Sequence, residues 1–172
     1  MTDERFEHDF SYTPQHVANY FLERADRDGV PITQMKLIKL VYIAFGWTLA
    51  LLDWEIFDED IEAWQHGPVI PSIYHEFKKF GRDPITERAT DFDLDTFDEF
   101  EPSIPVEDEE TAVILDRVWS SYKSFSGSAL RNKTHAVGTP WYNTYNPTSR
   151  NAVIPNDQIK EHFRGKIAEY LK

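Results

Sequence analysis

A run of 13 uncharged residues, Leu40 to Leu52, constrains the fold of this chain more than any other feature. It continues a helical pattern that begins near Thr33 as amphipathic and then becomes apolar on all sides. A helix that is apolar all round must be surrounded by other elements. Crossing a bilayer takes roughly 20 apolar residues, so this run is too short for a membrane span. We therefore expect a buried helix at the centre of the fold.

Helical periodicity and capping residues predict further helices on both sides of the central one. Thr13 and Pro14 supply an N-cap and a first turn, and Asn156 caps the last helix. The expected helices cover about residues 13–28, 71–80, 107–125, 128–133 and 156–170, residues 54–65 suit a short β-hairpin, and residues 138–147 are expected to be irregular. The sequence thus predicts a mainly α (α+β) fold, a single compact domain of five or six helices around the central apolar helix with a small β-hairpin.

A length of 172 residues favours one domain, which we expect to cover residues 13–172 after a flexible N-terminal tail over residues 1–12. Within it, residues 91–110 contain ten Asp or Glu and no Lys or Arg. Four large apolar side chains are interleaved with these acids: Phe92, Leu94, Phe97 and Phe100. Such a segment forms either a solvated acidic loop or an acidic arm whose aromatic residues dock onto a basic partner.

The net charge of −12 and the pI of about 4.8 restrict the partners. An acidic chain without a dense Lys/Arg run repels nucleic acid and anionic membranes, so we expect no direct nucleic-acid contact. The sequence contains no cysteine, which excludes disulfides, thiolate catalysis and zinc sites that need sulfur. The acidic N-terminus lacks the basic and apolar stretches of an export signal, so we expect a cytoplasmic protein without a membrane span.

Candidate catalytic residues are few. His75-Glu76 lacks the second histidine four residues later that zinc binding on one helix face requires, and His66, His135 and His162 could meet only through the fold. No nucleophile-elbow, phosphate-loop or dinucleotide motif is present, so we expect no enzyme, metal or cofactor. Lys36 and Lys39 are interpreted as lysines at the rim of the core rather than as a DNA-recognition face, and Trp64, Trp119 and Trp141 as candidate interface anchors.

Two stretches carry a specific pattern. Residues 36–81 contain Lys-Leu-x-Tyr in the central helix, followed by Ala-Trp-x-x-Gly-Pro-Val-x-Pro and a helix that carries a tyrosine. Residues 130–141 contain Leu-x-x-x-Thr-His and Pro-Trp. The chain resembles, over about residues 14–171, the Panacea domain of SocA-like antitoxins and phage-associated GepA-type proteins. The family pattern falls on Lys39, Tyr42, Ala63, Trp64, Gly67, Pro68, Val69, Pro71, Tyr74, Thr134, His135, Pro140 and Trp141, while His66 stands where the family often has an aromatic residue.

The resemblance implies an antitoxin of a type II-like toxin–antitoxin system that neutralises its toxin by direct contact and catalyses no reaction. On this basis, partner contacts are expected from Lys39, Trp64, His66, Tyr74, His135 and Trp141, and shaping of turns from Gly67, Pro68, Val69, Pro71 and Pro140. The acidic charge favours a basic toxin. Two alternatives stay open: an adaptor that delivers a toxin to a host protease, and a small-ligand or hydrolase-type protein that uses His66 and His135. The oligomeric state is also open.

Overall fold

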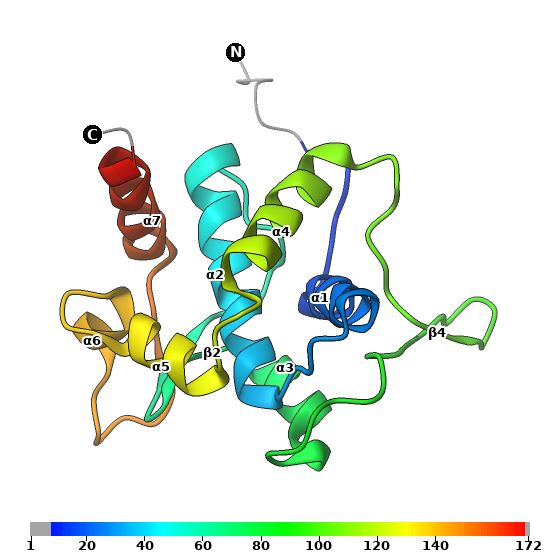
Figure 1. Cartoon of the computed structure of the whole chain (residues 1–172), viewed down its shortest axis with the longest axis horizontal. Coiled ribbons are helices and arrows are strands. Elements are labelled where there is room, and N and C mark those ends of the chain that lie inside the picture. Colours follow the sequence, from blue (N-terminus) through cyan, green and yellow to red (C-terminus); the bar gives the residue numbers. More distant parts are fainter. Residues whose placement is uncertain (1–7, 171–172) are drawn as a thin grey trace.

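The computed structural model describes residues 8–170 and shows a mainly α architecture with two small antiparallel sheets (Figure 1). Within this range the α-helices are α1 (Pro14–Asp28), α2 (Gln34–Leu52), α3 (Pro71–Phe77), α4 (Glu109–Tyr122), α5 (Gly127–His135), α6 (Pro140–Thr144) and α7 (Asn156–Tyr170). A 3-10 turn, η2 (Lys78–Phe80), follows α3. The strands are β1 (Glu62–Trp64), β2 (Gly67–Val69), β3 (Asp91–Phe92), β4 (Glu99–Phe100) and β5 (Ala152–Val153). The expected fold class is confirmed.

The central helix, α2, lies where the apolar run predicts it, with α1, α4, α5 and α7 packed around it (Figure 1). The Thr33 hydroxyl caps its first turn by accepting a hydrogen bond from the backbone N–H of Lys36. Asp53 ends it in the left-handed conformation, with φ of 53°. By length and composition α2 could cross a membrane, but 78% of its apolar stretch is buried inside the fold. Burial along most of its length therefore makes α2 the centre of the core.

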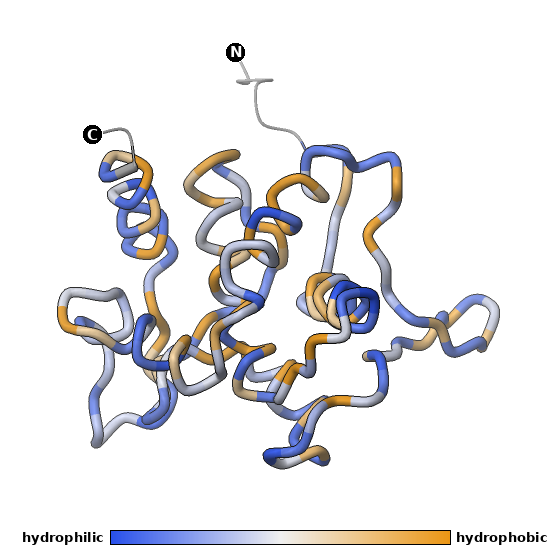
Figure 2. Tube along the Cα trace, viewed as in Figure 1, coloured by the Kyte–Doolittle hydropathy of each residue, from blue (hydrophilic) through white to orange (hydrophobic). Residues whose placement is uncertain are grey.

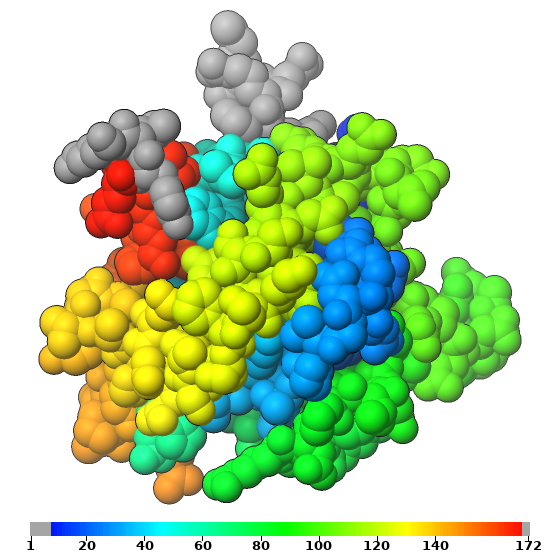
Figure 3. All heavy atoms as spheres, viewed as in Figure 1, coloured from blue at the N-terminus to red at the C-terminus, as the bar shows by residue number. Residues whose placement is uncertain are grey.

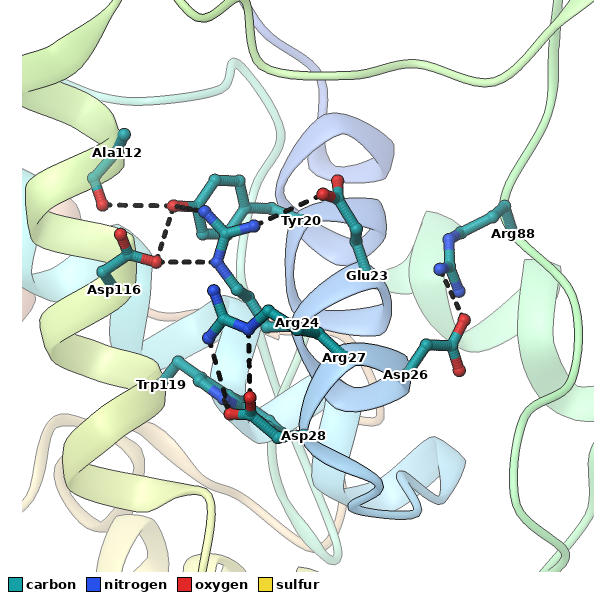
Figure 4. Close-up of polar contacts among 10 residues, drawn as sticks. All are labelled: Tyr20, Glu23, Arg24, Asp26, Arg27, Asp28, Arg88, Ala112, Asp116 and Trp119. Atoms are coloured by element: carbon teal, nitrogen blue, oxygen red, sulfur yellow. Dashed lines mark hydrogen bonds and ion pairs between the residues drawn. The ribbon is translucent and has the colours of Figure 1, made fainter.

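Partly buried polar contacts join α1 to α4 (Figure 4). Tyr20 donates its hydroxyl hydrogen to Asp116 at 2.7 Å, and Arg24 donates to both of these side chains. Near the other end of α1, the indole N–H of Trp119 donates to Asp28 at 2.7 Å. Trp119 is buried, so the expectation that it anchors an interface is wrong; its ring fills the core while its N–H binds a helix end.

A close approach between α2 and α7 depends on Gly46. A Cβ added at this position would overlap the ring of Phe163, which is itself buried. We expect Gly46→Ala to destabilise the domain by about 1–3 kcal/mol, because overpacking a filled core forces strained side chains or a backbone shift. The measurement is urea unfolding. The double variant Gly46→Ala/Phe163→Leu should recover part of the loss, whereas simple addition of the two single effects would contradict this contact.

The hairpin lies later in the chain than predicted. Its strands are β1 and β2, joined by Gln65 and His66, whereas residues 54–61 form no hairpin. The apolar residues at 56, 57 and 61 are buried; Phe57 forms a bridge with Tyr12, and the backbone oxygen of Ile61 accepts a hydrogen bond from the N–H of Ile154 at 2.8 Å. β5 adds to the free side of β1, giving the order β2-β1-β5. Residues 138–147 were expected to be irregular, but α6 lies within this stretch and β5 follows it, so the expectation is wrong in part.

The predicted tail falls mostly on residues 1–7, which lie outside the described residues. Three of its last five residues, His8, Phe10 and Tyr12, contact the rest of the domain. His8 stacks on Trp54 with 3.6 Å between ring centroids, and the buried Tyr12 donates its hydroxyl hydrogen to Asp108 at 2.5 Å. Asp108 also accepts from the backbone N–H of Thr111 as the N-cap of α4. This part of the N-terminal segment therefore stabilises the start of α4.

The first half of the acidic segment forms a hairpin of β3 and β4 that projects from the body (Figures 1 and 3). Hydrophilic and hydrophobic residues both occur along it (Figure 2). The side chains of Phe92, Leu94, Phe97 and Phe100 are all exposed. In the second half, Glu109 and Glu110 occupy the first turn of α4, where negative charge favours the helix dipole. The segment is thus an acidic hairpin followed by a helix start.

Candidate functional site

The Gly-Pro-Val motif forms strand β2, and its glycine is required by geometry. Gly67 has φ of 111°, a conformation that side chains with a Cβ rarely adopt. A Cβ at this position would also lie 2.8 Å from Nζ of Lys39. Pro68 lies on an edge strand, where its missing N–H costs no ladder bond. Pro71 occupies the first turn of α3, as predicted.

Lys39 lies beneath this strand and is only 2% exposed. Its ammonium donates to the backbone oxygen of Pro68 at 2.9 Å. Burial, and secondarily the charge of Arg131, lower the pKa of Lys39 to about 7. Lys36 is buried too, and its ammonium donates to the backbone oxygen of Lys123 at 2.5 Å. The interpretation of both residues as rim lysines is therefore wrong, because backbone carbonyls inside the fold receive their ammonium groups.

The second motif stretch meets the first through Trp141. Its indole N–H donates to the backbone oxygen of Trp64 at 2.6 Å. The ring of Trp141 is stacked with two others: His135 stacks on it with 3.7 Å between ring centroids, and Tyr145 stacks on it with 4.7 Å between ring centroids. Thr134 donates its hydroxyl hydrogen to the backbone oxygen of Leu130. The family pattern thus joins the hairpin, α5 and α6 into one unit.

Four basic side chains gather at this junction: Lys39, His66, Arg131 and His135. Burial lowers the pKa of His66, and the nearby charges of Arg131, Lys39 and His135 lower it further. Arg131 was missed by the sequence reasoning, although its spacing of four residues from His135 on a helix indicates a shared face. The sequence-based alternative with His66 and His135 therefore has its two imidazoles in one region. The Nε2 atom of His135 also lies 3.3 Å from the backbone oxygen of Gln65.

The accessible part of the motif is aromatic and polar. Trp64 and Tyr74 are partly exposed and pack edge to face, with 4.9 Å between their centroids. The indole N–H of Trp64 donates to the carboxylate of Glu62 at 2.6 Å. His66, two residues after Trp64 in the sequence, is exposed. Lys39 and Trp141 are buried, with Trp141 only 4% exposed, so their roles in the fold are internal. Partner contact by Trp64, His66, Tyr74 and His135 stays a prediction.

Metal and cofactor sites are not apparent in the described residues. Within residues 8–170, no group of three or more His, Asp or Glu side chains is arranged to hold a metal ion. The threonine of the second motif, Thr134, has its hydroxyl hydrogen directed at a backbone oxygen. What the junction does chemically is to satisfy buried polar groups: a lysine ammonium and an indole N–H each bind a carbonyl of the hairpin.

Comparison with known proteins places these features in a family. A family model described as "Antitoxin SocA-like, Panacea domain" matches residues 37–142, which include both motif stretches from Lys39 to Trp141. The chain is also 32% identical over 152 residues to Antitoxin SocA of Caulobacter vibrioides (strain NA1000 / CB15N). That alignment covers 86% of this chain and 80% of the relative. No solved structure matches significantly. The chain belongs to the SocA-like antitoxin family and carries its Panacea domain.

Proposed function

We propose that this chain is the antitoxin of a type II-like toxin–antitoxin pair and that it neutralises its toxin by direct protein–protein binding, without a catalytic reaction. The observation that carries the proposal is the relationship to Antitoxin SocA along most of both chains. The hairpin junction supports it, because the motif side chains that are buried serve the fold and leave an aromatic pair, Trp64 and Tyr74, at the surface. Aromatic side chains of this kind are frequent anchors of protein interfaces.

The experiment is co-expression with the product of the adjacent reading frame. We expect that product alone to stop growth, and this chain to restore growth and co-purify with it. A reading frame whose product is not toxic, or a toxin that stays active and fails to co-purify, would contradict the proposal. The cell line should lack the major cytoplasmic proteases, because neutralisation that disappears there would point to delivery of the toxin to a protease instead.

The net charge of −12 supports a basic toxin. Complementary charge raises the rate of encounter and disfavours acidic competitors, while affinity comes mainly from buried contacts. The acidic hairpin is the candidate for this steering role, since it projects from the body and presents Asp91, Asp95 and Asp98 with exposed aromatic side chains (Figure 3).

Neutralising the hairpin acids should slow association with the toxin. The variant replaces Asp91, Asp93, Asp95 and Asp98 with Asn and Glu99 with Gln. We expect an association rate about tenfold lower at low salt and little changed at high salt, because salt screens steering between exposed charges. Stopped-flow mixing measures the rate.

The matched control removes five charges elsewhere on the surface, from the exposed residues Glu55, Asp58, Asp60, Asp157 and Glu161. This control tests whether total charge alone explains the effect. Equal slowing by both variants would remove the special role of the hairpin, and equal slowing at low and high salt would indicate damage to the fold rather than lost steering.

A further inference from the structure

A groove runs between α4 and α7, with α2 as its floor, and we call it the α4–α7 groove. Two cavities of about 600 and 620 Å³ make it up, and they share Tyr122 and Lys133 in their linings. In Figure 3, atoms of α2 are visible between α4 and α7. The groove is thus a continuous surface feature rather than two separate pits.

The floor and walls of the groove follow helix stripes. Ile43, Trp47 and Leu51 lie four residues apart on α2 and line the floor in order. This stripe is about 12 Å long, or roughly two turns of a helix laid along it. Val113 of α4 borders the cavity that contains Trp47 and Leu51. The buried Phe163 of α7 borders the other cavity and packs edge to face on Trp47 at 5.3 Å. The shape suits a helix lying alongside α2.

The groove exposes apolar surface that the fold itself does not cover. Leu51 is 51% exposed and Val113 is 58% exposed, although each lies on a helix whose other face packs into the core. Large exposed apolar side chains gathered in one groove mark an interaction site more often than scattered ones do. The apolar end of the groove therefore indicates a partner with an apolar face.

The charge in the groove is opposite to that of the chain. Its lining contains Arg117, Lys133, Lys166 and His162 against the single carboxylate of Glu169. Among the residues that the structure describes, neither Lys133 nor Lys166 forms an ion pair with a carboxylate; their ammonium groups lie over the rings of Phe125 and Phe163, each at 5.0 Å. Burial lowers the pKa of Lys166, the nearby Lys133 charge lowers it further, and Glu169 opposes the shift. Two neighbouring cations that repel each other, the exposed Lys133 and the partly buried Lys166, favour an anionic partner.

We propose that the α4–α7 groove binds an amphipathic helix of the toxin, whose apolar residues cover Trp47, Leu51 and Val113 and whose carboxylates pair with Lys133 and Lys166. The proposal rests on the proposed function and names the surface through which it operates. A second copy of the chain, applied groove to groove, would bring the same cations together and is disfavoured. The toxin can be basic overall and still present an acidic helix here, just as this acidic chain presents a basic groove.

The first test uses the absence of cysteine from the chain, which makes single thiols clean reporters. Leu51→Cys and Val113→Cys place a thiol in the groove, and Val153→Cys places a control on β5, where the native side chain is 45% exposed. Complex formation with the toxin from the adjacent reading frame is confirmed by size exclusion, and alkylation by a maleimide is then timed. We expect the toxin to slow alkylation of L51C and V113C at least about tenfold, since interface cores exclude solvent, and to leave V153C unchanged.

The outcomes separate the two proposals. If the wild-type chain binds no toxin, the proposed function fails. If a complex forms and the thiols of L51C and V113C react as fast as in the free chain, the groove proposal fails while the function stands. Protection of these thiols at high concentration of the chain alone would assign the groove to a second copy and overturn the proposal as well.

The second test addresses the charge of the occupant. Lys133→Glu/Lys166→Glu should weaken the toxin complex at least about 30-fold, because it replaces two interfacial attractions with repulsions. The matched control, Lys78→Glu/Lys79→Glu, makes the same change in net charge on η2. Equal weakening by both pairs, with thermal unfolding unchanged, would contradict an acidic helix in the groove.

Discussion

Leu40→Asp is expected to unfold the domain. Leu40 is completely buried in the middle of α2, where helices pack on every side. An aspartate there would lose the packing of the leucine and would leave a carboxylate without a partner, at a combined cost of at least about 4 kcal/mol. Since small domains are stable by roughly 5–15 kcal/mol, most or all of the stability would be lost. Circular dichroism and urea unfolding measure the effect.

The control is the same substitution at the exposed end of the same helix. Leu51→Asp changes a side chain that is 51% exposed, so it should cost about 1 kcal/mol or less and leave the fold intact. If Leu40→Asp unfolded no more readily than Leu51→Asp, α2 could not be the buried centre of the domain. L51D also serves as a folded variant with a damaged groove.

Lys39→Met is expected to change how stability depends on pH. The folded chain holds the pKa of Lys39 near 7, whereas the ordinary value is 10.5. Between these values the unfolded chain binds a proton that the folded chain does not, so wild-type stability rises with pH across this window and falls as pH drops toward the folded pKa. This contribution amounts to about 3 kcal/mol between about pH 7 and about pH 9.5, and K39M lacks it.

The measurement is the difference in the free energy of unfolding between wild type and K39M at several pH values. Taking this difference cancels the other titrating groups, which both proteins share. The stability of K39M should increase relative to that of the wild type as the pH is lowered, even though the backbone oxygen of Pro68 loses its hydrogen-bond donor in this variant. A difference that stays constant over the window would show that Lys39 titrates normally and is not buried as described.

The helices were predictable because their signals are local. The uncharged run of α2, the Thr13-Pro14 start of α1 and the acids before α4 each act within a few residues, and the structure places all three helices there. The hairpin was misplaced because strand pairing is settled elsewhere in the chain: β1 is completed by β5, about 90 residues later. Local pattern carries no information about such a partner.

The sequence allowed us to predict where the motif residues meet, but not which of their side chains are buried. Family pattern brought Gly67, Thr134 and Trp141 to notice, and the structure joins their segments in one junction. Burial of Lys39 could not be foreseen, because a lysine on an amphipathic stretch is expected at the rim until the carbonyl that receives it is known. The α4–α7 groove could not be found either, because its cations come from three helices that only the fold brings together.

We propose that this protein blocks a toxin by binding and transforms nothing. The most direct measurement titrates the activity of purified toxin with the purified chain, in the absence of any other protein. We expect inhibition to reach completion at a fixed molar ratio, without delay, and the toxin recovered after denaturation and refolding to have its original mass and activity. Progressive inactivation by a small fraction of an equivalent, or a change in the mass of the toxin, would contradict it.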